Sequence, residues 1–203
     1  MVTKPSGDVR HINRWRGSRP VLCHTLTLLV LGASVLGDGW AEEKTLAARW
    51  EFGTEDTSGL KAHGDVRRDM AGPSAPEFPE LDPNNTAVYL DGKGSYFSQA
   101  DPGEHSPYDF GNGNAITLEA WVKVDRIGKG QPMYVVGKGR TGAPEFPKNN
   151  QNWSLRLVGA GDGLAVLSVI FATTADSGAY QFHRWTSKET LDVELGWHHI
   201  AMA

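Results

Sequence analysis

The stretch Ala115-Ile-Thr-Leu-Glu-Ala-Trp-Val-Lys-Val124 decides the fold class of this chain. An aliphatic residue stands at every second position, and polar residues and Trp121 stand between them. Successive side chains of a β-strand point to opposite faces, so this period of two predicts a strand with one aliphatic face and with Trp121 on the other. The aliphatic face would consist of Ile116, Leu118, Ala120, Val122 and Val124.

Short runs rich in β-branched and aromatic residues recur on both sides of this strand, each bounded by turn-forming residues. They lie at Leu46–Phe52, Ala87–Leu90, Tyr96–Gln99, Met133–Gly137, Trp153–Val158, Leu164–Ala172 and Trp197–Met202. The run at Leu164–Ala172 is apolar on both faces apart from Ser168, which predicts a central strand, and Gly159–Gly163 predicts a hairpin turn before it. Two proline-containing stretches, 55–83 and 139–152, show no strand pattern and are predicted to be long loops. Eight short strands without crossover helices predict an all-β fold, an antiparallel two-sheet β-sandwich or jelly roll.

Residues 1–41 have the layout of a secretory signal. Lysines and arginines come first, an apolar run covers Val21–Leu36, and Gly39 and Ala41 supply the small residues that a signal peptidase accepts. The apolar run is shorter than the roughly 20 residues that a membrane-spanning helix needs. We therefore predict cleavage after Ala41, a secreted or periplasmic location, and no stable membrane span in residues 42–203.

Charge and cysteine content exclude several classes of function. Lys and Arg number 20 against 24 Asp and Glu, and no basic patch dominates, so binding of nucleic acid is not expected. The only cysteine, Cys23, lies within the predicted signal. Residues 42–203 therefore offer no disulfide, no cysteine nucleophile and no cysteine-based metal site.

Five segments follow one another in the order seen in laminin-G-like and concanavalin-A-like jelly-roll domains, and over residues 46–203 the chain resembles that family. They are Ala48-Arg-Trp-Glu-Phe52, Val88-Tyr-Leu-Asp-Gly-Lys-Gly-Ser-Tyr96, Ile116-Thr-Leu-Glu-Ala-Trp-Val122, Gly137-Lys-Gly139 and Gly196-Trp-His-His-Ile-Ala201. The chain looks closest to versions found in large exported proteins of environmental bacteria. In the family the tryptophan–histidine strand is followed by a hairpin and further strands. The resemblance thus implies that residues 42–203 form the first part of a jelly-roll domain, incomplete at its C-terminal side and with an apolar edge left unpaired.

The resemblance implies an exported, non-catalytic recognition module that binds a glycan or an extracellular protein at one sheet face or at the loop rim. Two alternatives stay open: a glycoside hydrolase of the same fold, and a purely structural segment of a larger exported protein. Many relatives hold calcium with loop oxygens at the rim, so calcium is the one cofactor that the resemblance suggests. Calcium takes six to eight oxygen ligands. The loop acids that could supply some of them are Glu55, Asp56, Asp101, Glu104 and Asp109.

Aromatic residues in polar surroundings are the candidates for stacking on sugar rings. Trp121 is predicted to face away from the aliphatic side of its strand, and Tyr180 and Trp185 lie in a polar aromatic stretch at 178–187. Packing of Trp185 beneath a loop is the competing interpretation. Trp153 alternates with Leu155 and Leu157 and is expected in the core.

No catalytic pattern emerges, and we predict that the chain is not an enzyme. Asp192 and Glu194 would share a strand face if that stretch is extended, but the E-x-D-x-x-E spacing of the glucanases with this fold is absent and a solvated charged face is the simpler interpretation. The G-x-G-x-x-G match at Gly137–Gly142 is followed by Pro144 and Pro147, which excludes the helix that dinucleotide binding requires. Adjacent residues of a strand point to opposite faces, so the pair His198-His199 is expected to be structural.

Overall fold

A computed structural model describes residues 26–32, 45–52, 59–103, 105–110, 114–139, 152–174 and 177–203, with only the backbone described for 26–32, Thr45, Thr174 and Tyr180. Its regular structure is antiparallel β-sheet plus one 3-10 turn, and the described residues contain no α-helix. Among these residues, therefore, no helix is long and apolar enough to span a membrane. The all-β prediction is confirmed.

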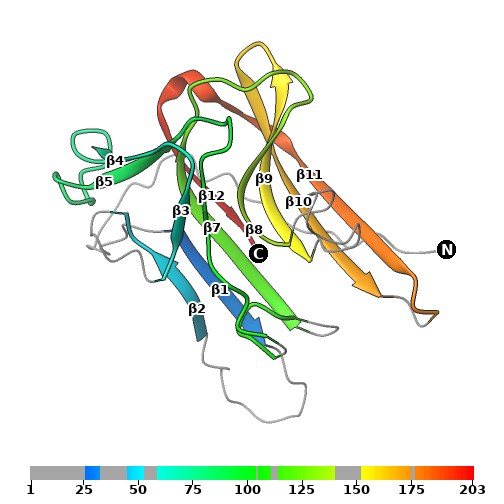
Figure 1. The fold of residues 1–203 in the computed structure, drawn as a ribbon. Coiled ribbons are helices and arrows are strands. Elements are labelled where there is room, and N and C mark those ends of the chain that lie inside the picture. The colour runs from blue at the N-terminus through cyan, green and yellow to red at the C-terminus, as the bar shows by residue number, and fades with distance from the viewer. Residues whose placement is uncertain are drawn as a thin grey trace, which may run out of the picture.

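Sheet I consists of four strands in the order β12-β7-β1-β2 (Figure 1). These are β12 (Trp197–Met202), β7 (Asn114–Lys123), β1 (Leu26–Gly32) and β2 (Thr45–Trp50). Three of the four match predicted strands. The fourth, β1, is formed by the apolar run of the predicted signal and lies between β7 and β2, hydrogen-bonded to both.

Sheet II is a meander in the order β11-β10-β9-β8. Its strands are β11 (Tyr180–Asp192), β10 (Leu164–Thr174), β9 (Trp153–Gly161) and β8 (Pro132–Lys138). As predicted, β10 is a central strand and forms a hairpin with β9. Asp162 and Gly163 make the turn with φ of 53° and 73°, the left-handed conformations that a two-residue hairpin of this kind requires.

Two small sheets lie within and after the stretch 55–83, which the sequence predicted to be a loop throughout. In them β3 (Lys61–His63) pairs with β6 (Tyr96–Ser98), and β4 (Val66–Ala71) pairs with β5 (Thr86–Leu90). The loop prediction is wrong for β3 and β4. Several of their residues are charged and most are exposed, so no alternation of apolar and polar residues reveals them. The second predicted loop, 139–152, lies almost wholly outside the described residues.

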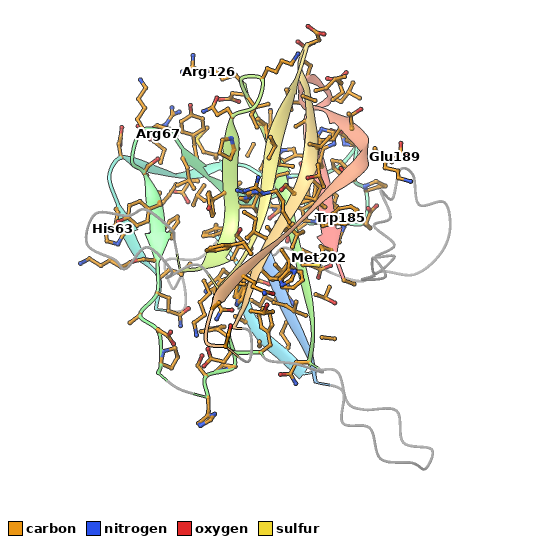
Figure 2. All side chains as sticks on the ribbon, turned by 90° about the vertical axis from the view of Figure 1, so that its right-hand side faces the viewer. His63, Arg67, Arg126, Trp185, Glu189 and Met202 are labelled. Carbon is orange, nitrogen blue, oxygen red and sulfur yellow. The ribbon has the colours of Figure 1, made fainter. Side chains whose placement is uncertain are left out.

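One hydrophobic core draws on both large sheets. Leu118, Ala120 and Ile200 contribute from sheet I, and Leu155 and Leu157, both fully buried, contribute from sheet II. The predicted aliphatic face of β7 is confirmed, because Leu118, Ala120 and Val124 are core residues and Ile116 and Val122 pack against them. Trp185 and Met202 also pack against this core, and Figure 2 shows them near the middle of the molecule with Arg126 and Glu189 farther out.

Candidate functional site

Residues of the loop 101–110 and the start of β7 border an open pocket of about 760 Å³, which we call the rim pocket. It is lined by Asp101, Gly103, His105, Ser106, Asp109, Phe110 and Asn114. Short-range hydrogen bonds shape the loop: the Gly103 N–H donates to Asp101 Oδ1 at 3.1 Å, and the Ser106 N–H donates to Asp109 Oδ2 at 2.9 Å. Such side-chain to backbone bonds hold a turn without any regular secondary structure.

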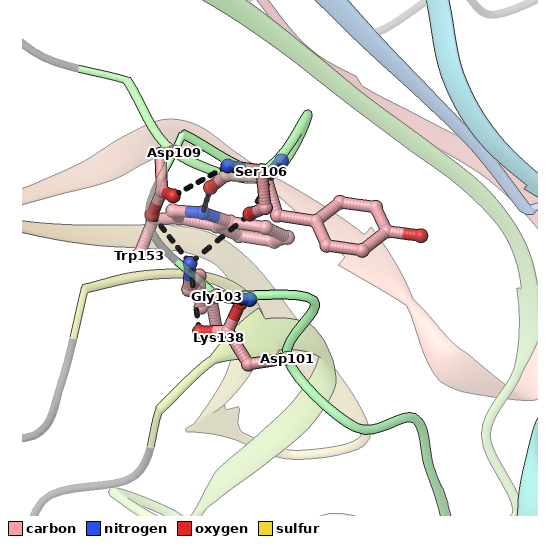
Figure 3. Close-up of polar contacts among 7 residues, drawn as sticks. Asp101, Gly103, Ser106, Asp109, Lys138 and Trp153 are labelled. Atoms are coloured by element: carbon pink, nitrogen blue, oxygen red, sulfur yellow. Dashed lines mark hydrogen bonds and ion pairs between the residues drawn. The ribbon is translucent and has the colours of Figure 1, made fainter.

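Lys138, the last residue of β8, reaches into this loop. Its Nζ lies 2.5 Å from Asp109 Oδ1 and 3.0 Å from Asp101 Oδ2, and it is 3.5 Å from the Ser106 hydroxyl oxygen. Figure 3 shows the ammonium group between the two carboxylates. The Lys138 side chain is only 17% exposed, whereas that of Asp101 is 52% exposed. One cation thus ties two loop acids to the end of a core strand, while one of these acids still faces solvent.

Electrostatics keeps this cluster charged at neutral pH. The hydrogen bond from the Gly103 N–H, followed by that from Lys138, holds the pKa of Asp101 below its usual range. The hydrogen bond from Lys138 does the same for the pKa of Asp109. Burial alone would lower the pKa of Lys138, but its hydrogen bonds to Asp109 and Asp101 outweigh this and raise it. Two carboxylates and one ammonium leave one net negative charge at the rim pocket.

Trp153 holds the loop that lines the rim pocket against the core. Its ring is almost fully buried in the core, and its Nε1–H donates to the backbone oxygen of Tyr108 at 3.0 Å. The ring centroid of Phe110 lies 6.0 Å from that of Trp153. The predicted core position of Trp153 is confirmed, and the same residue connects the core to the loop that lines the rim pocket.

The acids suggested for calcium do not form a calcium site in the part of the chain that the structure describes. Asp101 and Asp109 converge, but on Lys138, which neutralises one of their two negative charges. Among the described residues no group of three or more His, Cys, Asp or Glu side chains could hold a metal. Glu55, Asp56 and Glu104 lie outside the described residues. The donor set described therefore does not fit an ion that takes six to eight oxygens.

The structure does not bring the three predicted aromatic ligand-binding residues together. Trp121 is on β7 of sheet I, faces away from the core as predicted, and packs edge-on against Phe78 at 4.7 Å between ring centroids. Trp185 lies within β11 of sheet II, not in a loop, and packs partly against the core. Tyr180 is the first residue of β11, and only its backbone is described.

The acidic pair considered for glycoside hydrolysis does not share a strand face. β11 ends at Asp192, whose Oδ1 accepts the Glu194 N–H at 3.0 Å and caps the 3-10 turn Val193–Leu195. The two histidines make structural contacts, as expected. His198 Nε2 lies 2.8 Å from the Asp192 backbone oxygen, and the ring of His199 lies 5.2 Å from that of Trp121.

Sequence reasoning singled out Asp101 and Asp109 but missed Lys138, Ser106 and His105 as parts of one site. The only signal was the Gly-Lys-Gly segment at 137–139, which marks a family resemblance and says nothing of a partner. Comparison of the chain with family models, curated proteins and solved structures finds no match.

The ion cluster predicts a pH-dependent effect of Lys138→Met. We expect this change to cost about 1 kcal/mol of unfolding free energy at pH 7, the upper end for a partly exposed ion pair. The lowered carboxyl pKa values mean that the stabilisation is complete above about pH 4 and is lost as the pH falls through the folded-state values. The raised Lys138 pKa means that it is also lost as the pH rises above about 10.4, through the folded-state value.

Urea melts at pH 7 and pH 2.5 check this expectation. The difference between wild type and Lys138→Met should be clearly smaller at pH 2.5 than at pH 7. Lys123→Met, which removes an exposed lysine of β7, serves as the control and should change stability little at either pH. An equal loss at both pH values would show that Lys138 stabilises through packing of its stem rather than through its charge.

Proposed function

We propose that the protein is an exported, non-catalytic recognition module of laminin-G-like jelly-roll type, and that it binds a carbohydrate or an extracellular protein through the rim pocket. The observation that carries this proposal is the cluster of Asp101, Ser106, Asp109 and Lys138 at the mouth of that pocket. Recognition loops held on a rigid β-scaffold are a common arrangement for binding. Here Trp153 and Lys138 both connect the described part of the loop to the scaffold.

The chemistry of the lining suits a ligand rich in hydroxyl groups. Asp101 is ionised and half exposed, so it can accept hydrogen bonds from hydroxyl donors, which are stronger to a charged acceptor. Asn114 adds an amide at the start of β7, and Phe110 adds an apolar surface. A few fixed polar groups beside an apolar surface are typical of small-ligand sites. Sugars combine both kinds of surface, so a glycan is the ligand class that we favour.

Glycan-array screening of the exported protein, followed by calorimetry with the retained glycans, tests the proposal. We expect Asp101→Asn to weaken binding at least tenfold, about 1.4 kcal/mol, because a charged acceptor becomes a neutral one. Asp125→Asn, at an exposed acid after β7, should bind like wild type.

Three outcomes would contradict the proposal. Equal weakening of glycan binding by Asp101→Asn and Asp125→Asn would show that the rim pocket is not the binding site. Retention of no glycan and no extracellular protein would favour a purely structural segment. Release of reducing sugars, abolished by Glu194→Gln, would favour the hydrolase instead.

Export itself is tested by the mature N-terminus. From the cationic start, the apolar run and the small residues up to Ala41, we expect the secreted protein to begin at Glu42. Mass spectrometry of protein recovered from the periplasm or medium measures this directly. A soluble cytoplasmic pool that retains Met1 would contradict it.

A further inference from the structure

The strand β1 lies between β2 and β7, which are not hydrogen-bonded to each other. Leu28 is paired with Leu118 of β7 on one side and with Ala48 of β2 on the other. Thr27, Leu29 and Val30 are likewise paired on both sides. Figure 1 shows β1 in blue between β2 and β7. We call this position the strand slot.

The segment in the strand slot is the apolar run of the predicted signal. Cleavage after Ala41 would remove β1 from the exported protein, and with it the strand that joins β2 to β7 in sheet I. Neighbouring strands are spaced by about 4.8 Å. With one strand missing between them, β2 and β7 would lie roughly 10 Å apart, twice the normal spacing. Their backbone N–H and C=O groups facing the gap would have lost their partners.

We propose that in the exported protein the strand slot is a binding site for an extended apolar segment of a second protein, which pairs with β2 and β7 at once. Addition of a peptide strand to exposed sheet edges is a general mode of recognition. β1 itself, seated in the slot, shows the form of the occupant: about seven extended residues, antiparallel to both neighbours. The inference depends on signal cleavage and is independent of ligand binding at the rim pocket.

The register defines which positions of the occupant must be apolar. Residues directly opposite one another in a sheet share a face. The positions of Leu28 and Val30 are opposite Leu118 and Ile116, which belong to the core side of β7. The position of Thr27 is opposite Glu119, on the other face. The occupant therefore needs aliphatic residues at alternate positions facing the core and tolerates polar residues between them.

One end of the strand slot adjoins the rim pocket. Gly32 of β1 is paired with Asn114, which also lines that pocket. A partner strand would thus end beside the candidate ligand site, and its next residues would leave the sheet at the pocket wall.

Strand exchange in the intact chain tests the proposal. The full chain is produced in the cytoplasm with a specific protease site inserted between Gly32 and Thr45, purified folded, and then cut. The probe is a fluorescent peptide with the sequence of residues 24–34 and terminal lysines for solubility. We expect the peptide to enter the cut protein in a one-to-one ratio, as a rise in fluorescence anisotropy, and not to enter the uncut protein.

Two matched peptides locate the contact. A peptide with Leu28→Lys should bind at least tenfold more weakly than the parent, because a charge would replace an aliphatic residue at a core-facing position. A peptide with Thr27→Lys should bind within threefold of the parent, since that position lies opposite Glu119. Absence of exchange, or equal binding of all three peptides, would overturn the proposal.

A second measurement avoids reliance on the cut protein. In the uncut chain, Leu28→Lys should speed hydrogen exchange of the β7 amides, and the parent peptide added in excess should slow it again at least tenfold. No effect of the peptide would also overturn the proposal. Strand exchange without any glycan binding would contradict only the function proposed for the rim pocket, so the two ideas fail separately.

Discussion

Residues 42–203 produced without residues 1–41, and with no partner strand in the strand slot, are expected to be aggregation-prone or partly unfolded, and several kcal/mol less stable than the full chain. Sheet I then loses its second interior strand, and core residues such as Leu118 lose part of their cover. Exposure of a few hundred Å² of apolar surface costs several kcal/mol at roughly 25 cal/mol per Å². That is a large share of the 5–15 kcal/mol by which domains are typically stable.

Urea melts followed by tryptophan fluorescence, together with gel filtration, measure the effect. Trp50 and Trp153 lie in the core and report its integrity in both chains. If residues 42–203 unfold in a single cooperative transition from a soluble monomer, with the same midpoint as the full chain, then β1 contributes little to the stability of the fold. The strand slot would in that case need no occupant.

Gly159→Ala is expected to lower the free energy of unfolding by about 3 kcal/mol, the cost of overpacking against atoms that cannot give way. A β-carbon at Gly159 would overlap the backbone oxygen of Gly128 and lie 2.8 Å from its carbonyl carbon. The loop 128–131 is held at this place by backbone bonds, including Gly130 N–H to Gly159 O at 2.8 Å. For a chain of this size the midpoint of thermal unfolding should fall by about 3 °C for each kcal/mol.

Gly128→Ala is the matched control for this variant. A β-carbon there would meet only the flexible end of Gln131, at 3.2 Å from its Oε1. We expect it to cost less than about 1 kcal/mol, as an ordinary surface change does. Equal midpoints for the two variants in thermal denaturation would mean that the loop 128–131 moves freely away from β9.

Strands rich in aliphatic or aromatic residues could be predicted from the sequence, at sheet edges such as β2, β8 and β12 as well as inside the sheets, whereas the polar strands β3, β4 and β11 could not. β7 and β9 have aliphatic or aromatic residues at alternate positions because one face of each packs into the core, and β10 is apolar on both faces apart from Ser168. β11 is the longest strand, yet most of its side chains are exposed and polar, and it is held by pairing with β10. In β4 the Arg67 guanidinium lies 3.9 Å from the centroid of the Tyr89 ring on β5. No periodic pattern in the sequence predicts this contact.

The candidate site could be predicted only in part, for a similar reason. Asp101 and Asp109 stand out as loop acids, and two nearby carboxylates indicate a cation between them. That cation is Lys138, whose position beside the loop depends on where β8 ends in sheet II. No local sequence pattern determines how close Lys138 comes to Asp101 and Asp109. Two of the acids suggested as calcium ligands thus lie at one site, but they contact a lysine there.

The pairing of β7 with β1 and β12 also sets the order in which the chain can fold. In sheet II each strand pairs with its neighbour in sequence, so that sheet can close as soon as its own consecutive strands are made. In sheet I, Leu118 pairs with both Leu28 and Met202, which are far away along the chain, and such contacts form slowly. Sheet I closes fully only after residues 197–202 have left the ribosome. β1 can pair with β2 and β7 before that point, so export by way of this segment, as proposed above, would have to begin before those pairs form.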